Sequence, residues 1–414
     1  MNPAQSAAAD HPCPPWLAQR LHAAGGSVSF AQYMDWALHD PDHGAYGSGR
    51  LQVGTRGDFA TSPSLGSDFA ALLAPQIAHW LLQLEGAAPS TLGIAPSPGR
   101  FSLIEAGPGE GDLAADLAEA LVAGWPALAE RLELLLVEPN EGMAARQRLR
   151  LASCPLPTRW CSLAELAAAP TQGVVLAHEV LDVLPVERVI WDGAHWRRQV
   201  VLLDEAASAG ATLRLAPGEP LDPQADPALW SQLQLRGLIA AERLPAGWTT
   251  ELHIAVAPWL AAAAAALARG VLLVVDYALE NRRYNVETRC GGTLIAYRHQ
   301  RASGDLLQDP GHWDLTSHLC LEPLEADART SGWQPLGQRL QGEALLALGL
   351  AQRLHGLQQT RPEQLAAALA SREALLRLVD PAGLGAFRWI AFARHGDRLF
   401  EDTLFLSDQP VQDG

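Results

Sequence analysis

Three glycines, each separated from the next by one residue, follow a short apolar run in the segment FSLIEAGPGEGDLAADLAEAL. Gly107, Gly109 and Gly111 let the backbone turn tightly and approach a ligand closely. The amphipathic stretch after them predicts a helix whose first N–H groups face the loop. This pattern predicts a binding site for a nucleotide-like cofactor.

The spacing of the glycines separates two candidate cofactors. The dinucleotide fingerprint GxGxxG/A requires a small residue at position 112, where the helix packs on the strand, and this chain has Asp112. The pattern E-x-G-x-G-x-G of S-adenosylmethionine loops matches Glu105 through Gly111 without a mismatch. We therefore predict S-adenosylmethionine as the cofactor, with an ordinary strand-to-helix turn as the alternative.

Acidic residues at the ends of apolar runs extend the predicted cofactor site. Glu138 ends the run LELLLVEPN, where a carboxylate can accept hydrogen bonds from both hydroxyls of a ribose; a surface glutamate is the alternative. Glu105 is expected to face the amino group of the methionine part, and residues 160–163 to border the adenine. The predicted cofactor-binding residues are Glu105, Gly107, Pro108, Gly109, Gly111, Glu138, Ser162 and His178.

Two further carboxylates follow the next apolar run, in VVLAHEVLDVLPVERV. His178 and Glu179 open an HExxH zinc motif, but Asp182 stands where the second histidine is required, and the preceding residues indicate a strand. Glu179 and Asp182 instead suit a guanidinium acceptor, because its planar fork pairs with carboxylates and its charge must be held against a sulfonium. We predict both as catalytic residues that orient the acceptor and help it lose a proton, with helix capping as the alternative.

Two segments of the chain have a sequence too irregular to predict a helix. Residues 39–80 are rich in glycine, aromatic and acidic residues, which predicts a long loop rather than a helix, of the kind that forms lids. Residues 291–319 are similar. Their histidines and aspartates, among them His299, Asp309 and His312, fit no standard metal-ligand spacing, so we predict no metal site.

Short apolar runs alternate with helical stretches from about residue 100 onward, which predicts an α/β fold with a doubly wound sheet. Loops at the carboxyl edge of such a sheet carry ligands, and each run ends in an acidic or small residue. This edge should therefore bring the predicted residues together. The expected strands are 101–107, 132–140, 173–182 and 270–279, with a closing strand at 387–396.

The organisation of the chain follows from these elements. We expect an N-terminal helical and lid segment over residues 1–99, joined by the Gly/Pro-rich linker GIAPSPGR at 93–100. The core should comprise 100–186 and 268–400. Residues 187–267, with hairpin-like pieces and Pro-rich loops, are expected to form an insertion that contributes to substrate binding.

Composition excludes several classes of protein. Among 414 residues there is no lysine, so neither Schiff-base catalysis nor the lysine of a nucleotide phosphate loop is available. Acidic residues outnumber basic ones by 46 to 30, for a net charge of −16. This argues against nucleic-acid binding and favours a basic or arginine-bearing protein partner.

The cysteines and the apolar runs bear on location. The five cysteines show no CxxC spacing, which indicates a reducing compartment. The most membrane-like stretch, 254–279, is interrupted by Arg269, so an Ala-rich helix followed by a buried strand is expected instead of a membrane span. The N-terminus has no features of a targeting peptide. We predict a cytoplasmic protein.

Several motifs together resemble one family. In chain order they are GDFATSP (57–63), EAGPGEG (105–111), HEVLDVLPV (178–186), VVDY (274–277), GTLIAY (292–297) and DLTSH (314–318). The chain resembles the MidA-type methyltransferases, which include a mitochondrial complex I assembly factor that dimethylates an arginine. It differs from the family pattern at Ser64, His178 and Ala278.

The resemblance implies a class I methyltransferase sheet, S-adenosylmethionine as methyl donor and a protein arginine as acceptor. The expected partner is then a protein that bears an arginine, such as a subunit of a respiratory NADH-dehydrogenase-like complex. Methylation of a small molecule on oxygen or nitrogen, and an S-adenosylmethionine-binding assembly factor without turnover, are the alternatives. The sequence leaves the oligomeric state open, a homodimer included.

Overall fold

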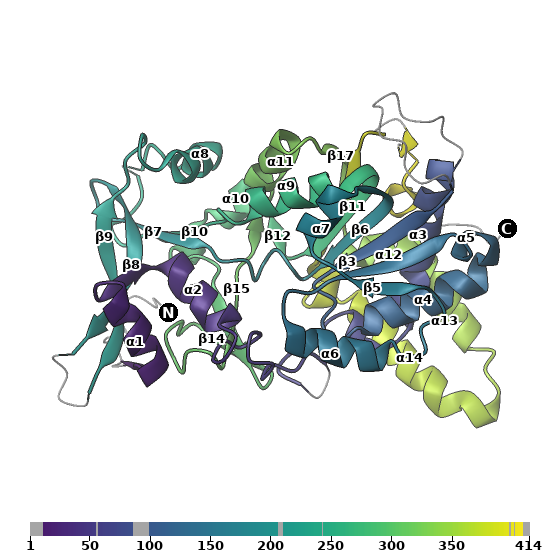
Figure 1. Cartoon of the computed structure of the whole chain (residues 1–414). Helices are drawn as coiled ribbons and strands as arrows, with labels where there is room; N and C mark the ends of the chain where they lie inside the picture. The colour runs from purple at the N-terminus through teal and green to yellow at the C-terminus, as the bar shows by residue number, and fades with distance from the viewer. Residues whose placement is uncertain are drawn as a thin grey trace. The chain divides into compact units, whose positions relative to one another are not determined.

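The structure is a computed structural model, and it describes residues 11–54, 57–85, 99–205, 210–241, 243–396, 399–400 and 402–408. The chain forms two compact units, each built from segments that lie far apart in the sequence (Figure 1). The first unit comprises Met1–Gln52, Asp182–Val256 and Leu279–Leu324. The second comprises Val53–Leu181, Ala257–Ala278 and Glu325–Gly414.

A seven-stranded sheet lies at the centre of the second unit, with the order β17-β18-β11-β6-β3-β4-β5. Neighbouring strands are parallel, except that β18 runs antiparallel to both β11 and β17. The connections reverse direction between β3 and β6, the point at which doubly wound sheets bind ligands. The strands are β3 (Phe101–Ala106), β4 (Leu132–Val137), β5 (Thr158–Trp160), β6 (Thr171–His178), β11 (Leu267–Asp276), β17 (Gln334–Leu340) and β18 (Arg388–Arg394).

The predicted fold class is confirmed. The four expected strands correspond to β3, β4, β6 and β11, and the expected closing strand to β18. Burial explains why these runs form strands, since every residue of β3 is buried, as are seven of the eight residues of β6. Strands covered on both faces carry continuous apolar sequence rather than an alternating pattern.

Helices cover the sheet of the second unit (Figure 1). Helices α3 and α4 pack on each other, and α3 also contacts β6 and β11. The expected Ala-rich helix is α9, which leads directly into β11. The helices are α3 (Asp68–Glu85), α4 (Asp112–Gly124), α5 (Pro126–Ala129), α6 (Glu141–Arg150), α7 (Leu163–Ala168), α9 (Val256–Ala266), α12 (Gln341–Ala347), α13 (Leu350–Leu357) and α14 (Leu365–Leu378).

The prediction that residues 39–80 lack a helix is wrong over the last part of that range, which α3 occupies. Apolar side chains recur at helical spacing there and are fully buried, among them Phe69, Leu73 and Ile77. Pro75 lies inside the helix and, together with the glycines before it, obscured this periodicity. Burial of the apolar face stabilises the helix despite the proline.

An antiparallel sheet organises the first unit. Its order is β1-β9-β8-β7-β10, with β2 paired to β8, and the expected hairpin is formed by β7 and β8. A second small sheet has the order β14-β13-β15. The elements are β1 (His11–Pro12), α1 (Pro15–Ala23), β2 (Ser27–Ser29), α2 (Phe30–His39), β7 (Glu187–Trp191), β8 (Trp196–Asp204), β9 (Thr212–Pro220), α8 (Pro227–Leu235), β10 (Thr249–Leu252), α10 (Asn281–Tyr284), β13 (Ile295–Arg298), β14 (Arg301–Ser303) and β15 (Asp314–Thr316).

The compact units divide the chain differently from the expected ranges. The segment 1–99 is shared, because residues up to Gln52 belong to the first unit and those from Val53 to the second. The insertion 187–267 lies in the first unit up to Val256, and Leu279–Leu324 joins it there. Composition does not reveal a unit of this kind, because its segments lie far apart in the sequence. Most of the expected linker, residues 93–98, lies outside the described residues.

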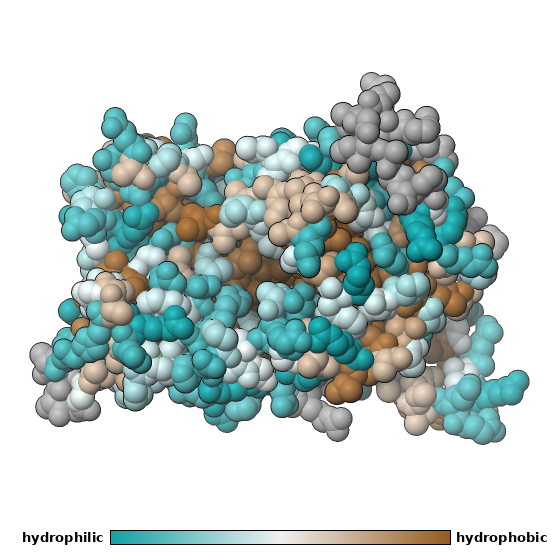
Figure 2. Space-filling view, in the orientation of Figure 1, coloured by the Kyte–Doolittle hydropathy of each residue, from teal (hydrophilic) through white to brown (hydrophobic). Residues whose placement is uncertain are grey.

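Hydrophilic side chains cover most of the face drawn in Figure 2. Hydrophobic side chains are distributed between the polar ones. Among the described residues, no helix has the length and apolar character needed to cross a membrane.

Candidate active site

The glycine loop joins β3 to α4 at the carboxyl edge of the seven-stranded sheet. All three glycines have positive φ, 61° at Gly107, 56° at Gly109 and 88° at Gly111, a conformation that L side chains rarely adopt. A Cβ atom at Gly109 would meet no atom within 4 Å, so this part of the loop borders open space. The carbonyl of Pro108 accepts a hydrogen bond from the N–H of Gly111, which closes the turn at 2.8 Å.

Glu105 lies near the end of β3, directly before this loop. The residue is only 3% exposed, and its Oε2 atom has no hydrogen-bond partner among the described residues. Burial, with a smaller contribution from Asp112, raises the pKa of Glu105 to about 8. A buried carboxyl group with an unused oxygen suits a ligand that brings a positive charge or a hydrogen-bond donor.

Glu138 follows β4 at the same edge, as predicted, and is held from two sides. Its Oε1 atom accepts from the N–H of Asn140 at 2.8 Å, and its Oε2 atom accepts from Nε2 of Gln147 at 3.0 Å. Burial raises its pKa, and these two hydrogen bonds oppose the rise. Each carboxylate oxygen retains a further lone pair, so the group can still accept hydrogen bonds from a ligand.

Gln147 was not predicted from the sequence, although its side chain contacts three parts of this edge. Its side chain is buried in α6 and also bonds the carbonyl of Gly109 and the indole N–H of Trp160. A glutamine within a polar helix carries no motif. The one available signal was its position, nine residues after Glu138 and on the helix that follows β4.

Ser162 has a local role. Its hydroxyl accepts from the N–H of Glu165 at 3.1 Å, and the carboxylate of Glu165 accepts from the N–H of Ser162 at 2.7 Å. This capping box starts α7. The cap accounts for a serine at this position without a cofactor.

His178 ends β6, next to β3 in the sheet. It is 8% exposed, packs edge-on against Phe69 and stacks on Phe387, and its Nε2 atom has no hydrogen-bond partner among the described residues. Burial lowers its pKa to about 3, so the imidazole is neutral at pH 7. Its Nδ1 atom lies 3.4 Å from Oε1 of Glu179.

Glu179 adopts a backbone conformation that is rare for a glutamate. Its φ is 53°, and its N–H donates to the carbonyl of Val275 at 2.9 Å. Non-glycine residues in this region cost of order 1–3 kcal/mol each and cluster at functional sites. The fold thus imposes this turn on Glu179 immediately beyond the strand end.

Asp276, at the end of β11, supports the same turn. Its side chain is fully buried, and it accepts from the N–H of Leu181 at 3.0 Å and from the N–H of Tyr277 at 2.8 Å. The ring of Tyr277 packs against Phe387 at 3.9 Å between centroids. The VVDY motif therefore fixes the segment that carries Glu179.

We expect Asp276→Ala to lower the free energy of unfolding by about 2–5 kcal/mol, because two buried N–H groups lose their acceptor. Urea unfolding followed by circular dichroism measures this loss. Asp276→Asn keeps one carbonyl acceptor and should lose less. An Asp276→Ala midpoint equal to that of the unmodified protein would contradict this role.

Asp182, the second predicted catalytic residue, belongs to the first unit. It is 2% exposed, and its carbonyl accepts from the N–H of Ser317 at 3.0 Å. The adjacent N–H of His318 donates to Oγ1 of Thr293 at 3.0 Å. Asp182 is thus tied to the DLTSH segment, which in turn rests on the GTLIAY segment.

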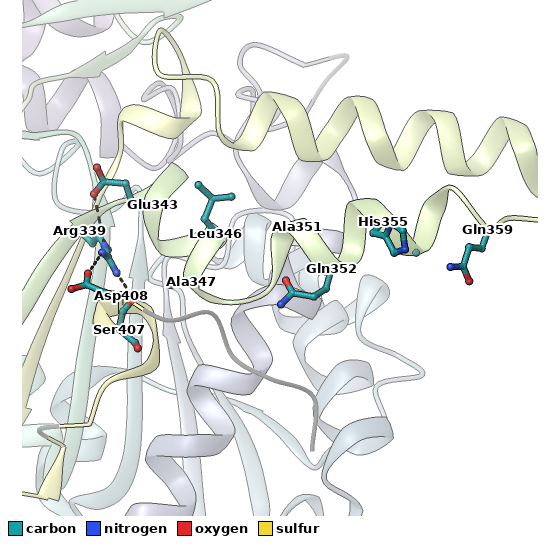
Figure 3. A pocket seen from close by; sticks show the side chains of 11 residues that line it. Arg339, Glu343, Leu346, Ala347, Ala351, Gln352, His355, Gln359, Ser407 and Asp408 are labelled. Carbon is teal, nitrogen blue, oxygen red and sulfur yellow. Dashed lines mark hydrogen bonds and ion pairs between the residues drawn. The ribbon is translucent and has the colours of Figure 1, made fainter.

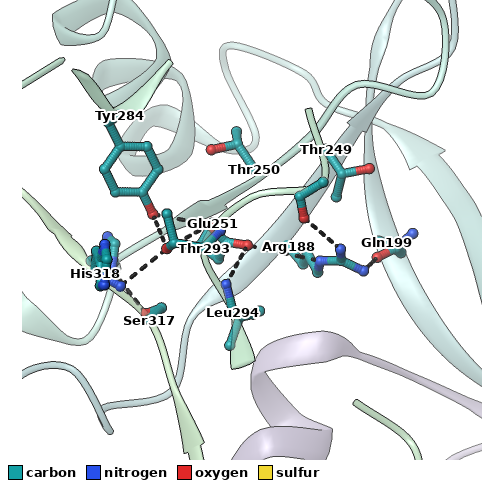
Figure 4. A network of polar contacts seen from close by, with 12 residues as sticks. Arg188, Gln199, Thr249, Thr250, Glu251, Tyr284, Thr293, Leu294, Ser317 and His318 are labelled. Carbon is teal, nitrogen blue, oxygen red and sulfur yellow. Dashed lines mark hydrogen bonds and ion pairs between the residues drawn. The ribbon is translucent and has the colours of Figure 1, made fainter. Parts of the chain in front are cut away.

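A buried carboxylate anchors these two segments (Figure 4). Glu251 in β10 is fully buried and accepts from the hydroxyl of Tyr284 at 2.9 Å and the N–H of Thr293 at 3.0 Å. Nε of Arg188 lies 4.0 Å from it. This network holds the GTLIAY and DLTSH segments together within the first unit.

A hollow of about 910 Å³ lies elsewhere in the second unit, between α12, α13 and residues 407–408 (Figure 3). None of the predicted site residues lines it. Arg339 at one end donates to the carbonyl of Ser407 and pairs with Asp408 at 2.8 Å. Among the described residues, no three His, Cys, Asp or Glu side chains are placed to hold a metal ion.

Comparison with known proteins decides the class of enzyme. The family model described as "Putative S-adenosyl-L-methionine-dependent methyltransferase" matches residues 72–339, more than half of the chain. The chain belongs to this methyltransferase family. The predicted resemblance and the predicted cofactor, S-adenosylmethionine, are thereby confirmed.

Individual relatives of this methyltransferase agree with the assignment. "Protein arginine methyltransferase NDUFAF7 homolog, mitochondrial" of Drosophila melanogaster is 28% identical, over 91% of this chain and 84% of the relative. The human protein arginine methyltransferase NDUFAF7 is 27% identical over half of each chain. A solved structure from Burkholderia thailandensis bound to S-adenosyl-homocysteine is 28% identical, with a TM-score of 0.76 over 95% of this chain and 98% of that one.

The residues at the sheet edge of this methyltransferase fit its cofactor. Gly109 leaves space for a ligand atom beside the backbone, and Glu105 presents a buried oxygen without a partner. Glu138 presents a carboxylate one strand away, at a distance along the sheet edge set by the pairing of β3 with β4. A ligand with an amino group and a ribose can be bound by such a set.

Proposed function

We propose that this methyltransferase is cytoplasmic and transfers methyl groups to an arginine of a protein, and that this protein is a subunit of a respiratory NADH-dehydrogenase-like complex. The printed names of the Drosophila and human relatives support the arginine acceptor. The order of motifs shared with the MidA-type family supports the complex. The observation that carries the acceptor class is Glu179, held in a strained turn at the end of β6.

The cofactor is bound by the carboxyl edge of the sheet in this proposal. S-adenosylmethionine supplies an electrophilic methyl group on a sulfonium. Glu105 pairs with the amino group in the methionine part of the cofactor, and the glycine loop passes close to the cofactor. Glu138 accepts hydrogen bonds from the ribose hydroxyls. His178 lines the same edge with a neutral imidazole, which adds no positive charge beside a sulfonium.

Glu179 orients the acceptor and offsets its charge. A guanidinium has a pKa of roughly 12.5 or higher, so it arrives protonated and is repelled by a sulfonium. A carboxylate paired with it would reduce this repulsion and would accept the proton that the guanidinium loses. Asp182 remains the second predicted residue for this role.

Because the pKa of Glu105 is raised, its role can be tested by the pH dependence of cofactor binding. At pH 7 the free enzyme holds this carboxyl mostly protonated, since its pKa is about 8. An amino group bound beside it favours the ionised form, so binding releases a proton and affinity rises with pH. We expect the affinity for S-adenosyl-homocysteine to increase between about pH 6 and 7.5, a range in which the amino group of the ligand stays protonated.

Isothermal titration in buffers of different ionisation enthalpy measures the released proton. Glu105→Gln should remove both the proton release and the rise in affinity over this range. Binding by the unmodified enzyme that is independent of pH would place the amino group elsewhere.

The acceptor is tested with the complex itself. The NADH-dehydrogenase-like complex is purified from cells that lack the enzyme and incubated with the enzyme and S-adenosylmethionine tritiated on the methyl group. Acid hydrolysis should then yield labelled methylarginine. Label confined to small molecules would favour the small-molecule alternative. Restoration of the complex in cells by a variant without transfer activity, such as Glu179→Gln, would favour the assembly factor.

A further inference from the structure

Gln147 uses every hydrogen-bonding group of its side-chain amide at the proposed cofactor edge. Its Nε2 atom donates to the carbonyl of Gly109 at 2.9 Å and to Oε2 of Glu138 at 3.0 Å. Its Oε1 atom accepts from the indole N–H of Trp160 at 2.9 Å. Because an indole N–H can only donate, it fixes which end of the amide is the oxygen.

These three partners follow three neighbouring strands. Gly109 lies in the loop after β3, Glu138 follows β4, and Trp160 ends β5. The side chain of Gln147 is fully buried, so each bond replaces a contact with water that burial has removed. One neutral side chain therefore fixes the relative positions of the loop, the carboxylate and the indole.

Uncharged donors hydrogen-bond to Glu138, while the neighbouring cation pairs with a different carboxylate. Arg146, the adjacent residue, pairs with Glu110 through two hydrogen bonds of 2.9 and 3.1 Å. A cation bonded directly to Glu138 would compete with neutral hydroxyl donors for the carboxylate. The amide of Gln147 and the N–H of Asn140 orient Glu138 without adding a charge.

We propose that Gln147 is a positioning residue that sets recognition of the adenosine part of the cofactor. It holds Glu138 toward the ribose hydroxyls and Trp160 beside the base. This inference rests on the proposed role of Glu138. Gln147 itself acts through its neighbours and needs no contact with the cofactor.

The test compares Gln147→Met, which keeps the length of the side chain but loses both donors, with the unmodified enzyme. Titration with S-adenosyl-homocysteine should show affinity weakened about 10- to 100-fold. The analogue without the ribose 2′-hydroxyl provides the readout that a merely structural role would not move. The unmodified enzyme should discriminate against it, and Gln147→Met should discriminate less.

Gln172→Met is the matched control. This glutamine, 9% exposed, lies at the opposite end of β6 and donates to the carbonyl of Arg100. Its replacement should leave both affinities unchanged. Unchanged affinity of Gln147→Met, or weakened binding with unaltered discrimination, would overturn the inference. If Glu138→Gln also leaves binding unchanged, the proposed ribose site itself is wrong, which separates the two failures.

Discussion

Gly109→Val is expected to weaken binding of S-adenosylmethionine about 100-fold or more, equivalent to about 2.7 kcal/mol. The space beside Gly109 is open in the protein, with no atom within 4 Å of a Cβ position. In the proposed complex the cofactor fills this space, so the valine side chain and the cofactor exclude each other. Isothermal titration of the variant measures the loss.

A matched glycine separates this effect from backbone strain. Gly349, between α12 and α13, also has positive φ, 95°, and meets only Oε1 of Gln352, at 3.7 Å. Gly349→Val should therefore incur similar strain in a loop away from the carboxyl edge, and bind the cofactor normally. Equal affinity in both variants would show that the cofactor does not approach the loop at Gly109.

Glu179→Gln is expected to lower the rate of methyl transfer about 100- to 1000-fold while leaving cofactor binding within a few-fold. The amide has nearly the same shape but no charge, so it neither offsets the guanidinium nor favours loss of its proton. Single-turnover transfer to the purified complex measures the rate. Titration with S-adenosyl-homocysteine measures binding.

Glu133→Gln provides the control for a carboxylate of the same sheet. Glu133 lies near the start of β4 and accepts from the hydroxyl of Ser102 at 2.9 Å. Its replacement should leave transfer unchanged. Transfer by Glu179→Gln at the rate of this control would remove Glu179 from the proposed mechanism.

The sequence predicts that Glu105, the glycine loop and Glu138 lie at one edge of the sheet, because the signals for this placement are local. The glycine spacing and the apolar runs before Glu105 and Glu138 each depend on one strand and its loop, and the structure places them at adjacent strands. Such features need no knowledge of distant contacts.

Features that depend on distant contacts could not be predicted in this way. Gln147 gains its importance from Gly109 and Trp160, which lie on other strand ends. Asp276 supports a turn that begins almost 100 residues earlier in the chain. The helix α3 has apolar residues at helical spacing, but it contains Pro75, and burial of its apolar face stabilises it despite this proline.

The division into two units has the same origin. Residues 279–324 join the first unit through the N–H of Ser317, which donates to the carbonyl of Asp182, and through the buried carboxylate of Glu251. Composition does not reveal the hydrogen bonds that Glu251 accepts from residues 33 and 42 positions later in the chain. The predicted core of 268–400 therefore included this segment.

A crystal structure of the enzyme with S-adenosyl-homocysteine tests the central claim most directly. The account predicts the ribose hydroxyls within hydrogen-bond distance of Glu138, the amino group beside Glu105, and the chain of the ligand against Gly109. A ligand bound at the same sheet edge with its ribose away from Glu138, or bound in the hollow beside Arg339, would contradict it.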